Sequence, residues 1–196
     1  MRLCVILNPT AGAVKDVDTV RERFDPLKPE RFHITTKPGD AETFARHASD
    51  FDLIVSAGGD GTLNEVVNGI ASGGCNAALA VFPLGTGNDF ARTLGLPNSA
   101  DGVMQQILEC KTRAIDLVRV TSDQVRYFAN VSSGGFSGVV DEKLTADMKR
   151  TWGPLAYLRS AAGAFAELRG YTTTVALDDA EASEVDLYNV VVAEDV

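Results

Sequence analysis

The chain has 196 residues, of which 45% are hydrophobic and 23% are charged, and its formal net charge is −9. This composition indicates a folded protein with one core and part of a second, and it excludes an intrinsically disordered chain. The acidic balance disfavours a nucleic-acid partner, because a negative surface repels a phosphate backbone. The three cysteines and two histidines match no disulfide framework or zinc pattern, so we expect reduced thiols in a cytoplasmic protein.

Short apolar runs alternate with helical patterns in the first part of the chain. Asp40 and Thr62 stand where helix N-caps are expected. The runs at 3–7 and 77–82 are apolar throughout, which is typical of strands buried on both faces. We expect strands over residues 3–7, 31–36, 51–57 and 77–82, and helices over residues 40–49, 62–72 and 88–94. This alternation predicts an α/β fold with a doubly wound parallel sheet.

The pattern changes near residue 113. Strand-like runs at 114–120 and 125–131 flank a polar turn and predict an antiparallel hairpin. We expect an Ala-rich helix over 155–168 and a second hairpin from 172–177 and 185–193. We therefore expect a nucleotide-binding α/β domain over 1–120, followed over 121–196 by part of a β-rich sandwich domain that would bind lipid. Because the sequence stops directly after an apolar run, we also expect a C-terminal truncation.

The sequence predicts neither a secretory leader nor a transmembrane segment. The first apolar run, residues 3–7, is too short for a leader core, and the longest uncharged stretch, residues 66–88, is broken by Gly, Asn and Pro. A lipid substrate would therefore be reached from the membrane surface. The expected location is the cytoplasm, with peripheral attachment at the inner membrane face.

Three loops at the ends of predicted strands have the composition of a phosphate site. The richest contains Gly58, Gly59, Asp60, Gly61 and Thr62. Glycines let backbone N–H groups approach an anion, and a following helix adds a favourable dipole. A carboxylate at Asp60 fits a divalent cation or a proton acceptor for an attacking hydroxyl. The alternative is a tight strand-to-helix turn with an exposed aspartate.

The third loop along the chain, residues 83–92, would form another wall of the same cleft. Thr86 and Asn88 could donate hydrogen bonds there, and Arg92 could neutralise a phosphate. The first loop along the chain, which follows the first strand and begins at Asn8, is a weaker signal. Neither a P-loop nor a G-x-G-x-x-G motif occurs, so nucleotide binding by those two motifs is excluded.

Together these loops resemble the catalytic domain shared by diacylglycerol kinases, sphingosine kinases and bacterial lipid kinases. The matching segments are residues 8–12, 58–66, 83–92, 115–117 and 128–136. The resemblance implies transfer of the γ-phosphate of ATP, with Mg²⁺, to a lipid hydroxyl such as that of diacylglycerol. It implies a catalytic role for Asp60 beside the phosphates. It also implies a nucleotide site formed by Asn8, Pro9, Gly12, Thr36, Gly58, Gly59, Gly61, Thr62, Glu65, Gly85, Thr86, Asn88 and Arg92.

The sequence departs from this family at its end. Relatives continue with a glycine-rich segment and an acidic motif that supplies a catalytic base and a metal network, and this sequence contains neither. No metal ligand is therefore assigned. Two alternatives stay open: an NAD kinase, which shares the Gly58–Thr62 pattern, and a nucleotide-binding fragment without activity.

Two further expectations concern partners. The region containing Lys143, Lys149, Arg150, Trp152, Tyr157 and Arg159 combines basic residues with aromatic residues, which is typical of a helix that touches anionic lipid. The alternative is a solvated helix face with Trp152 packed in a core. A homodimer is the other expectation.

Overall fold

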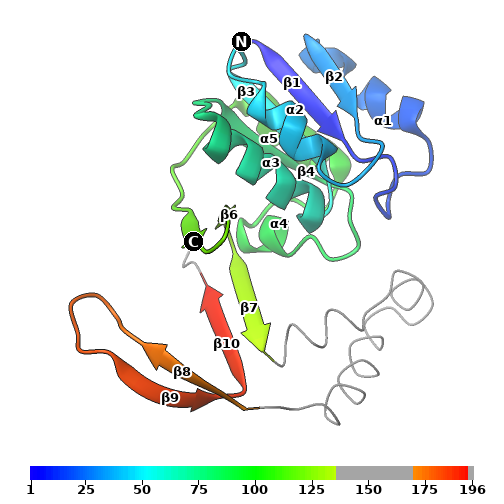
Figure 1. Ribbon diagram of the computed structural model, residues 1–196. Helices are drawn as coiled ribbons and strands as arrows, with labels where there is room; N and C mark the ends of the chain where they lie inside the picture. The colour runs from blue at the N-terminus through cyan, green and yellow to red at the C-terminus, as the bar shows by residue number, and fades with distance from the viewer. Residues whose placement is uncertain (136–169, 194–196) are drawn as a thin grey trace. The chain divides into compact units, whose positions relative to one another are not determined.

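The computed structural model describes residues 1–135 and 170–193, and it divides into two compact units (Figure 1). The first unit runs from Met1 to Asn130, and the second covers Val131–Ala193. The helix expected over 155–168 and the basic region expected to touch lipid, residues 143–159, lie outside the described residues.

Four parallel strands form the sheet of the first unit, in the order β2-β1-β3-β4. This arrangement, with helices packed against it, confirms the predicted α/β class. The residues of β1 and β3 are all buried, as their apolar runs predict. The strand expected over 31–36 ends at Ile34, because the next residues turn toward α2. The strands are β1 (Leu3–Leu7), β2 (Arg31–Ile34), β3 (Leu53–Gly58) and β4 (Ala78–Pro83).

Helices connect these strands, and two of them were not predicted. Both begin at a side-chain cap: Asp16 accepts from the Thr19 amide at 2.7 Å, and Ser99 accepts from the Gly102 amide at 3.2 Å. The helices are α1 (Val17–Arg23), α2 (Asp40–Arg46), α3 (Asp60–Gly73), α4 (Asp89–Thr93) and α5 (Ala100–Glu109), with a 3-10 turn, η1 (Asp25–Leu27).

The two predicted N-caps were wrong. Helix α2 is preceded by Gly39, whose φ of 87° belongs to the left-handed region that favours glycine, and Asp40 is the first helical residue. Helix α3 is preceded by Gly59, so it begins two residues before Thr62. Gly59 itself has extended backbone angles, so its glycine is explained by its neighbours and not by a left-handed turn.

The core lies on both faces of the sheet. Alternate residues of β1 point to opposite faces, so Val5 packs in the cluster that includes α1 and α5, whereas Ile6 packs in the cluster that includes α2 and α3. Phe24 and Phe82 meet edge to face in the first cluster, with ring centroids 5.0 Å apart. Each fully buried side chain of this size contributes about 1.5–3 kcal/mol of transfer free energy.

The rest of the described chain is antiparallel. Strands β5 (Val118–Thr121) and β6 (Val125–Phe128) form the hairpin expected there. In the second unit, β8 (Tyr171–Val175) pairs with β9 (Ser183–Leu187), and β7 (Val131–Gly135) pairs with β10 (Asn189–Ala193). The single strand expected over 185–193 was wrong: it divides at Tyr188 into two strands with different partners. Within the described residues, no helix has the length and apolar character needed to cross a membrane.

Candidate functional site

Three loops meet at the carboxyl end of the parallel strands. The loop after β1 begins with Asn8, whose amide donates to the Ala57 carbonyl oxygen of β3 at 2.9 Å. The loop after β4 begins with Leu84, whose amide donates to the Gly58 carbonyl oxygen at 2.8 Å. Leu84 in turn accepts from the Ala13 amide at 2.8 Å. These backbone bonds continue the sheet pairing into the loops and hold the three predicted segments together.

Glycine is required where the second and third loops touch. A Cβ on Gly85 would lie 2.6 Å from the Gly59 Cα, and one on Gly59 would lie 3.1 Å from the Gly85 Cα. The first distance is too short for a side chain, and the second would require the neighbouring backbone to shift by a few tenths of an ångström, so this close approach favours glycine at both positions. Close packing of the two backbones thus explains why glycine stands at Gly59 and at Gly85.

The side chain of Asn8 ties the first loop to α3. Its Nδ2 donates to the Thr62 hydroxyl at 3.1 Å, and its Oδ1 accepts from the Thr10 amide at 2.9 Å. Thr62 is buried in the first turn of α3, so the hydrogen bond that its hydroxyl accepts from Asn8 is shielded from water. The same loop approaches the third loop at Gly12, where a Cβ would lie 2.9 Å from the Thr86 Oγ1.

Asp60 is the first residue of α3 and is exposed. Its Oδ1 accepts from the Phe90 amide at 3.3 Å, which connects it to the first turn of α4. Its Oδ2 lies beside Gly87, where a Cβ would come within 3.2 Å. A carboxylate at a helix N-terminus is stabilised by the helix dipole. Asp60 therefore presents a negative charge at the point where the second and third loops meet.

Asn88 and Arg92 have partners within their own loop. Asn88 closes the turn around Gly85: its Oδ1 accepts from the Gly85 amide at 2.9 Å, and its Nδ2 donates to the Gly85 carbonyl oxygen at 2.8 Å. Arg92 forms an ion pair with Asp89 and donates to the Gly87 carbonyl oxygen. The charge predicted to neutralise a phosphate is thus already engaged by a neighbouring carboxylate.

Thr36 and Glu65 have partners at the start of α2. The Thr36 hydroxyl and amide donate to the Asp40 Oδ2 at 2.7 and 2.8 Å, and these bonds, with that from the Lys37 amide, lower the pKa of Asp40. Glu65, on α3, accepts from the Ala41 amide through Oε2 at 3.2 Å. Both side chains therefore act on the first turn of α2.

The structure brings most of the predicted residues together at one edge of the sheet. Those carried by the three connected loops are Asn8, Pro9, Gly12, Gly58, Gly59, Asp60, Gly61, Thr62, Gly85, Thr86 and Asn88. Thr36 and Glu65 instead bond to the start of α2, and Arg92 is paired within its own loop.

Lys15 is a candidate that the sequence reasoning missed. It lines a cavity of about 460 Å³ beside the loops after β1 and β4, together with Arg23 and Ser99. Arg23 already pairs with Asp101 at 3.0 Å, whereas the ion pairs of the described residues do not include Lys15. The sequence did offer a signal for this candidate: Lys15 is a cationic residue three positions after Gly12, in the loop that follows the first buried strand.

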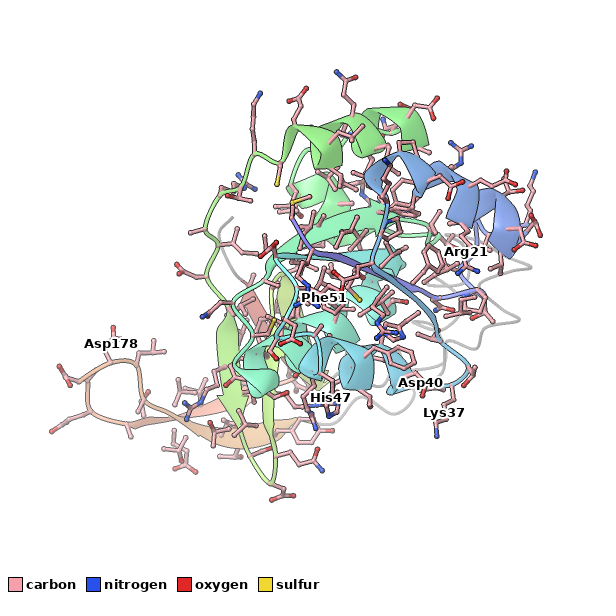
Figure 2. The ribbon with its side chains drawn as sticks, turned by 90° about the horizontal axis from the view of Figure 1, so that it is seen from above. Arg21, Lys37, Asp40, His47, Phe51 and Asp178 are labelled. Carbon is pink, nitrogen blue, oxygen red and sulfur yellow. The ribbon has the colours of Figure 1, made fainter. Side chains whose placement is uncertain are left out.

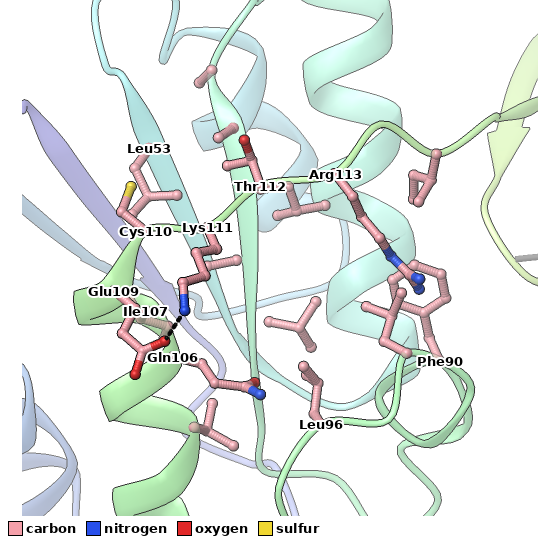
Figure 3. A pocket seen from close by; sticks show the side chains of 18 residues that line it. Leu53, Phe90, Leu96, Gln106, Ile107, Glu109, Cys110, Lys111, Thr112 and Arg113 are labelled. Atoms are coloured by element: carbon pink, nitrogen blue, oxygen red, sulfur yellow. Dashed lines mark hydrogen bonds and ion pairs between the residues drawn. The ribbon is translucent and has the colours of Figure 1, made fainter.

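A separate cavity of about 610 Å³ lies along β4 and α5, away from the loops (Figure 3). Its walls are mainly apolar and include Phe90, Leu96 and Ile107. Lys111 lies at this cavity and pairs with Glu109 at 3.0 Å, the contact drawn as a dashed line in Figure 3. None of the predicted site residues lines it.

Solved structures that resemble this chain over 98% of its length include two bacterial proteins. One is a Bacillus anthracis str. Sterne protein assigned to the diacylglycerol kinases, with a TM-score of 0.77 and 28% identity over 65% of that chain. The other, a diacylglycerol kinase from the same organism, has a TM-score of 0.70 and 24% identity over 62% of its chain and supports the fold alone.

Sequence comparison gives the same relationship. Curated diacylglycerol kinases from Staphylococcus epidermidis and Bacillus subtilis are 34% and 39% identical over 91% and 80% of this chain. The chain spans 57% and 53% of their respective lengths, so it covers little more than half of each. The model of the diacylglycerol kinase catalytic domain matches residues 2–120. The chain therefore belongs to the diacylglycerol kinase catalytic domain family.

Proposed function

We propose that this chain carries the nucleotide-binding part of a lipid kinase that transfers the γ-phosphate of ATP to a lipid hydroxyl such as that of diacylglycerol. The family match supports the kinase class. Residues 1–120 would bind the nucleotide, and residues 121–196 would begin the domain that holds the lipid. The enzyme would work from the cytoplasm on lipid at the membrane surface.

The observation that carries this proposal is the geometry of the first turn of α3. Gly59 and Gly85 pack backbone against backbone, and a Cβ on Gly61 would meet no atom of the described residues within 4 Å apart from its own helix. The amides at the start of this 14-residue helix are thus bordered by glycines, with open space at Gly61. Amides and the helix dipole at such a terminus bind phosphate.

The donor set at the loops fits Mg²⁺ that is bound mainly through phosphates. Within the described ranges, no group of three or more His, Cys, Asp or Glu side chains could hold a metal alone. Mg²⁺ commonly uses one or two carboxylates together with substrate phosphates and water. Asp60 would supply such a carboxylate, or would accept the proton of the lipid hydroxyl, and Lys15 would offset phosphate charge.

The family match also bears on the acceptor. It covers residues 2–120 with the diacylglycerol kinase catalytic domain, which supports a lipid acceptor over the NAD alternative. Incubating the chain with ATP and either dispersed diacylglycerol or NAD distinguishes the two. If the chain binds ATP but transfers phosphate to neither acceptor, the result would favour the other alternative, a nucleotide-binding fragment without catalytic activity.

The direct test is ATP affinity in the presence of Mg²⁺, measured by calorimetry for the wild type, Gly61→Ala and Gly170→Ala. A methyl group at Gly61 would obstruct a phosphate, so we expect affinity to fall at least about tenfold, the equivalent of one lost charge-assisted hydrogen bond. Gly170 is the matched control, because its Cβ would meet Tyr188 at an ordinary 3.6 Å. Equal affinity for all three folded proteins would refute the proposed site.

A further inference from the structure

A small pocket lies at the opposite edge of the sheet from the phosphate loops. It is formed at the amino ends of β1 and β2 and by the end of α2, and its volume is about 270 Å³. Both histidines of the chain line it, and so do two arginines, Arg2 and Arg31. Figure 2 shows His47 at the end of α2 and Phe51 on the segment that leads into β3. The pocket thus collects cationic and imidazole groups from three elements of an acidic protein.

The two imidazole rings are held by their surroundings. His33 stacks on Phe44, with ring centroids 4.3 Å apart and planes 11° from parallel. His47 has its Nδ1 2.8 Å from the Thr43 carbonyl oxygen. A carbonyl oxygen only accepts, so Nδ1 carries the proton and Nε2 is the nitrogen left for another partner. Protonation of Nε2 would turn it into a second donor.

The two arginines differ in what they already bind. Arg2 forms a two-point ion pair with Glu30, at 2.9 and 2.8 Å, and lies over the ring of Phe51 at 5.2 Å. Arg31 forms no ion pair with any described residue. Arg31 is exposed, so its guanidinium can bind an added anion without first breaking an ion pair with a carboxylate.

The acidic groups around the pocket set its pH dependence. Glu30 is matched by Arg2, and Asp52 faces the N-terminal ammonium at 3.9 Å. Asp50 also lines the pocket and adds one more negative charge. The local charge is therefore close to balanced while both imidazoles are neutral, and it becomes positive when they are protonated. Burial first, and then Arg31, lower the pKa of His33, so an anion that offsets these effects would raise it.

We infer that this pocket is a second anion site, separate from the phosphate loops, which takes a phosphate group or a dianion of similar size and binds it more tightly at mildly acidic pH. Its volume is below that of pockets for drug-sized ligands, which favours a single phosphate group over a whole nucleotide. The same chemistry would be offered by a free anion or by the headgroup of an anionic lipid.

The test follows the two histidine ring signals by NMR between pH 5 and 8. Sodium sulfate is compared with sodium chloride at equal ionic strength, because sulfate stays a dianion over this range. We expect sulfate to raise the pKa of His33 by on the order of one unit, because a bound dianion favours the protonated ring. Arg31→Gln should lose most of that shift, and Arg31→Lys should retain part of it.

Arg21→Gln is the matched control, because Arg21 lies over Phe32 at 5.1 Å and does not line this pocket. It should leave the sulfate effect intact. Equal shifts in sulfate and chloride, or an undiminished shift in folded Arg31→Gln, would overturn the inference. Phosphatidylcholine vesicles with and without phosphatidate then identify the source: a shift that needs phosphatidate assigns a lipid headgroup, and a shift with sulfate alone assigns a free anion.

Discussion

The side-chain amide of Asn68 pairs with the backbone of Tyr127 as a neighbouring strand would. Its Nδ2 donates to the Tyr127 carbonyl oxygen at 2.8 Å, and its Oδ1 accepts from the Tyr127 amide at 2.9 Å. Asn68 is 5% exposed, so both bonds are protected from water. The β5–β6 hairpin is therefore attached to α3, the helix that begins at Asp60.

Replacing this amide should destabilise the protein. Asn68→Ala leaves the backbone N–H and C=O of Tyr127 without their partner, and we expect a loss of about 1–3 kcal/mol in the free energy of unfolding, measured by urea denaturation. Gln105→Ala, on the exposed side of α5, is the control and should change little. Equal stability of the two variants would show that the hairpin does not depend on Asn68.

Two glycines of α3 should respond oppositely to the same substitution. A Cβ on Gly69 would lie 2.4 Å from the Glu42 carbonyl oxygen and 2.7 Å from the Ala45 Cβ, whereas one on Gly61 meets open space. Gly69→Ala should therefore cost about 1–3 kcal/mol through overpacking against α2. Gly61→Ala should leave the melting temperature unchanged or higher, since alanine favours helix. A stable Gly69→Ala protein would contradict the close packing of α2 and α3.

Asp40 should make stability depend on pH. Hydrogen bonds from Thr36 and Lys37 lower its pKa in the folded state. The stabilisation is therefore present above the unfolded pKa, about 3.9, and is lost as the pH falls through the folded value. Asp40→Asn mimics the protonated acid. We expect it to be less stable than wild type at pH 6 and to approach wild type at the lowest pH where both fold. A constant difference across the titration would contradict this role.

Ser56 should be replaceable by alanine. It lies in the middle of β3, is 1% exposed, and its Oγ has no hydrogen-bond partner among the described residues. An unpaired buried hydroxyl is costly, so Ser56→Ala should be neutral or stabilising by about 1 kcal/mol in thermal unfolding. Thr62→Val is the contrast, because the Thr62 hydroxyl accepts from Asn8. A marked loss of stability in Ser56→Ala would show that its hydroxyl is paired.

The three cysteines should differ in reactivity. Burial raises the pKa of Cys4 to about 11, and Cys75 is also buried, whereas Cys110 is exposed. Because the thiolate is the reactive form, iodoacetamide at pH 8 should modify Cys110 alone in the folded protein. Peptide mass spectrometry after a short pulse checks this. Rapid labelling of Cys4 under native conditions would mean that β1 is not buried as described.

Much of the fold follows from local pattern. The uniformly apolar run that became β1 has to be buried on both faces, so its position in the middle of a parallel sheet could be expected. The equally apolar run that became β4 lies at the edge of that sheet, where only Phe82 is buried. Helices α1 and α5 went unpredicted, although each has a capping residue, Asp16 and Ser99. The run at 185–193 looks continuous in sequence, but pairing with two separate strands divides it at Tyr188.

The sequence by itself determined the α/β class, the family and the three glycine loops, because strand periodicity and glycine spacing are local properties. Only the tertiary structure decided which polar groups are free. Asn88 and Arg92 resemble phosphate ligands in sequence, yet they bind their own loop. His33 and His47 look isolated, yet they share a pocket with Arg31. The partners of Asn88 and Arg92 depend on how their own turn folds, and the histidine pocket depends on contacts between separate strands and helices. Neither can be read from the spacing of residue types.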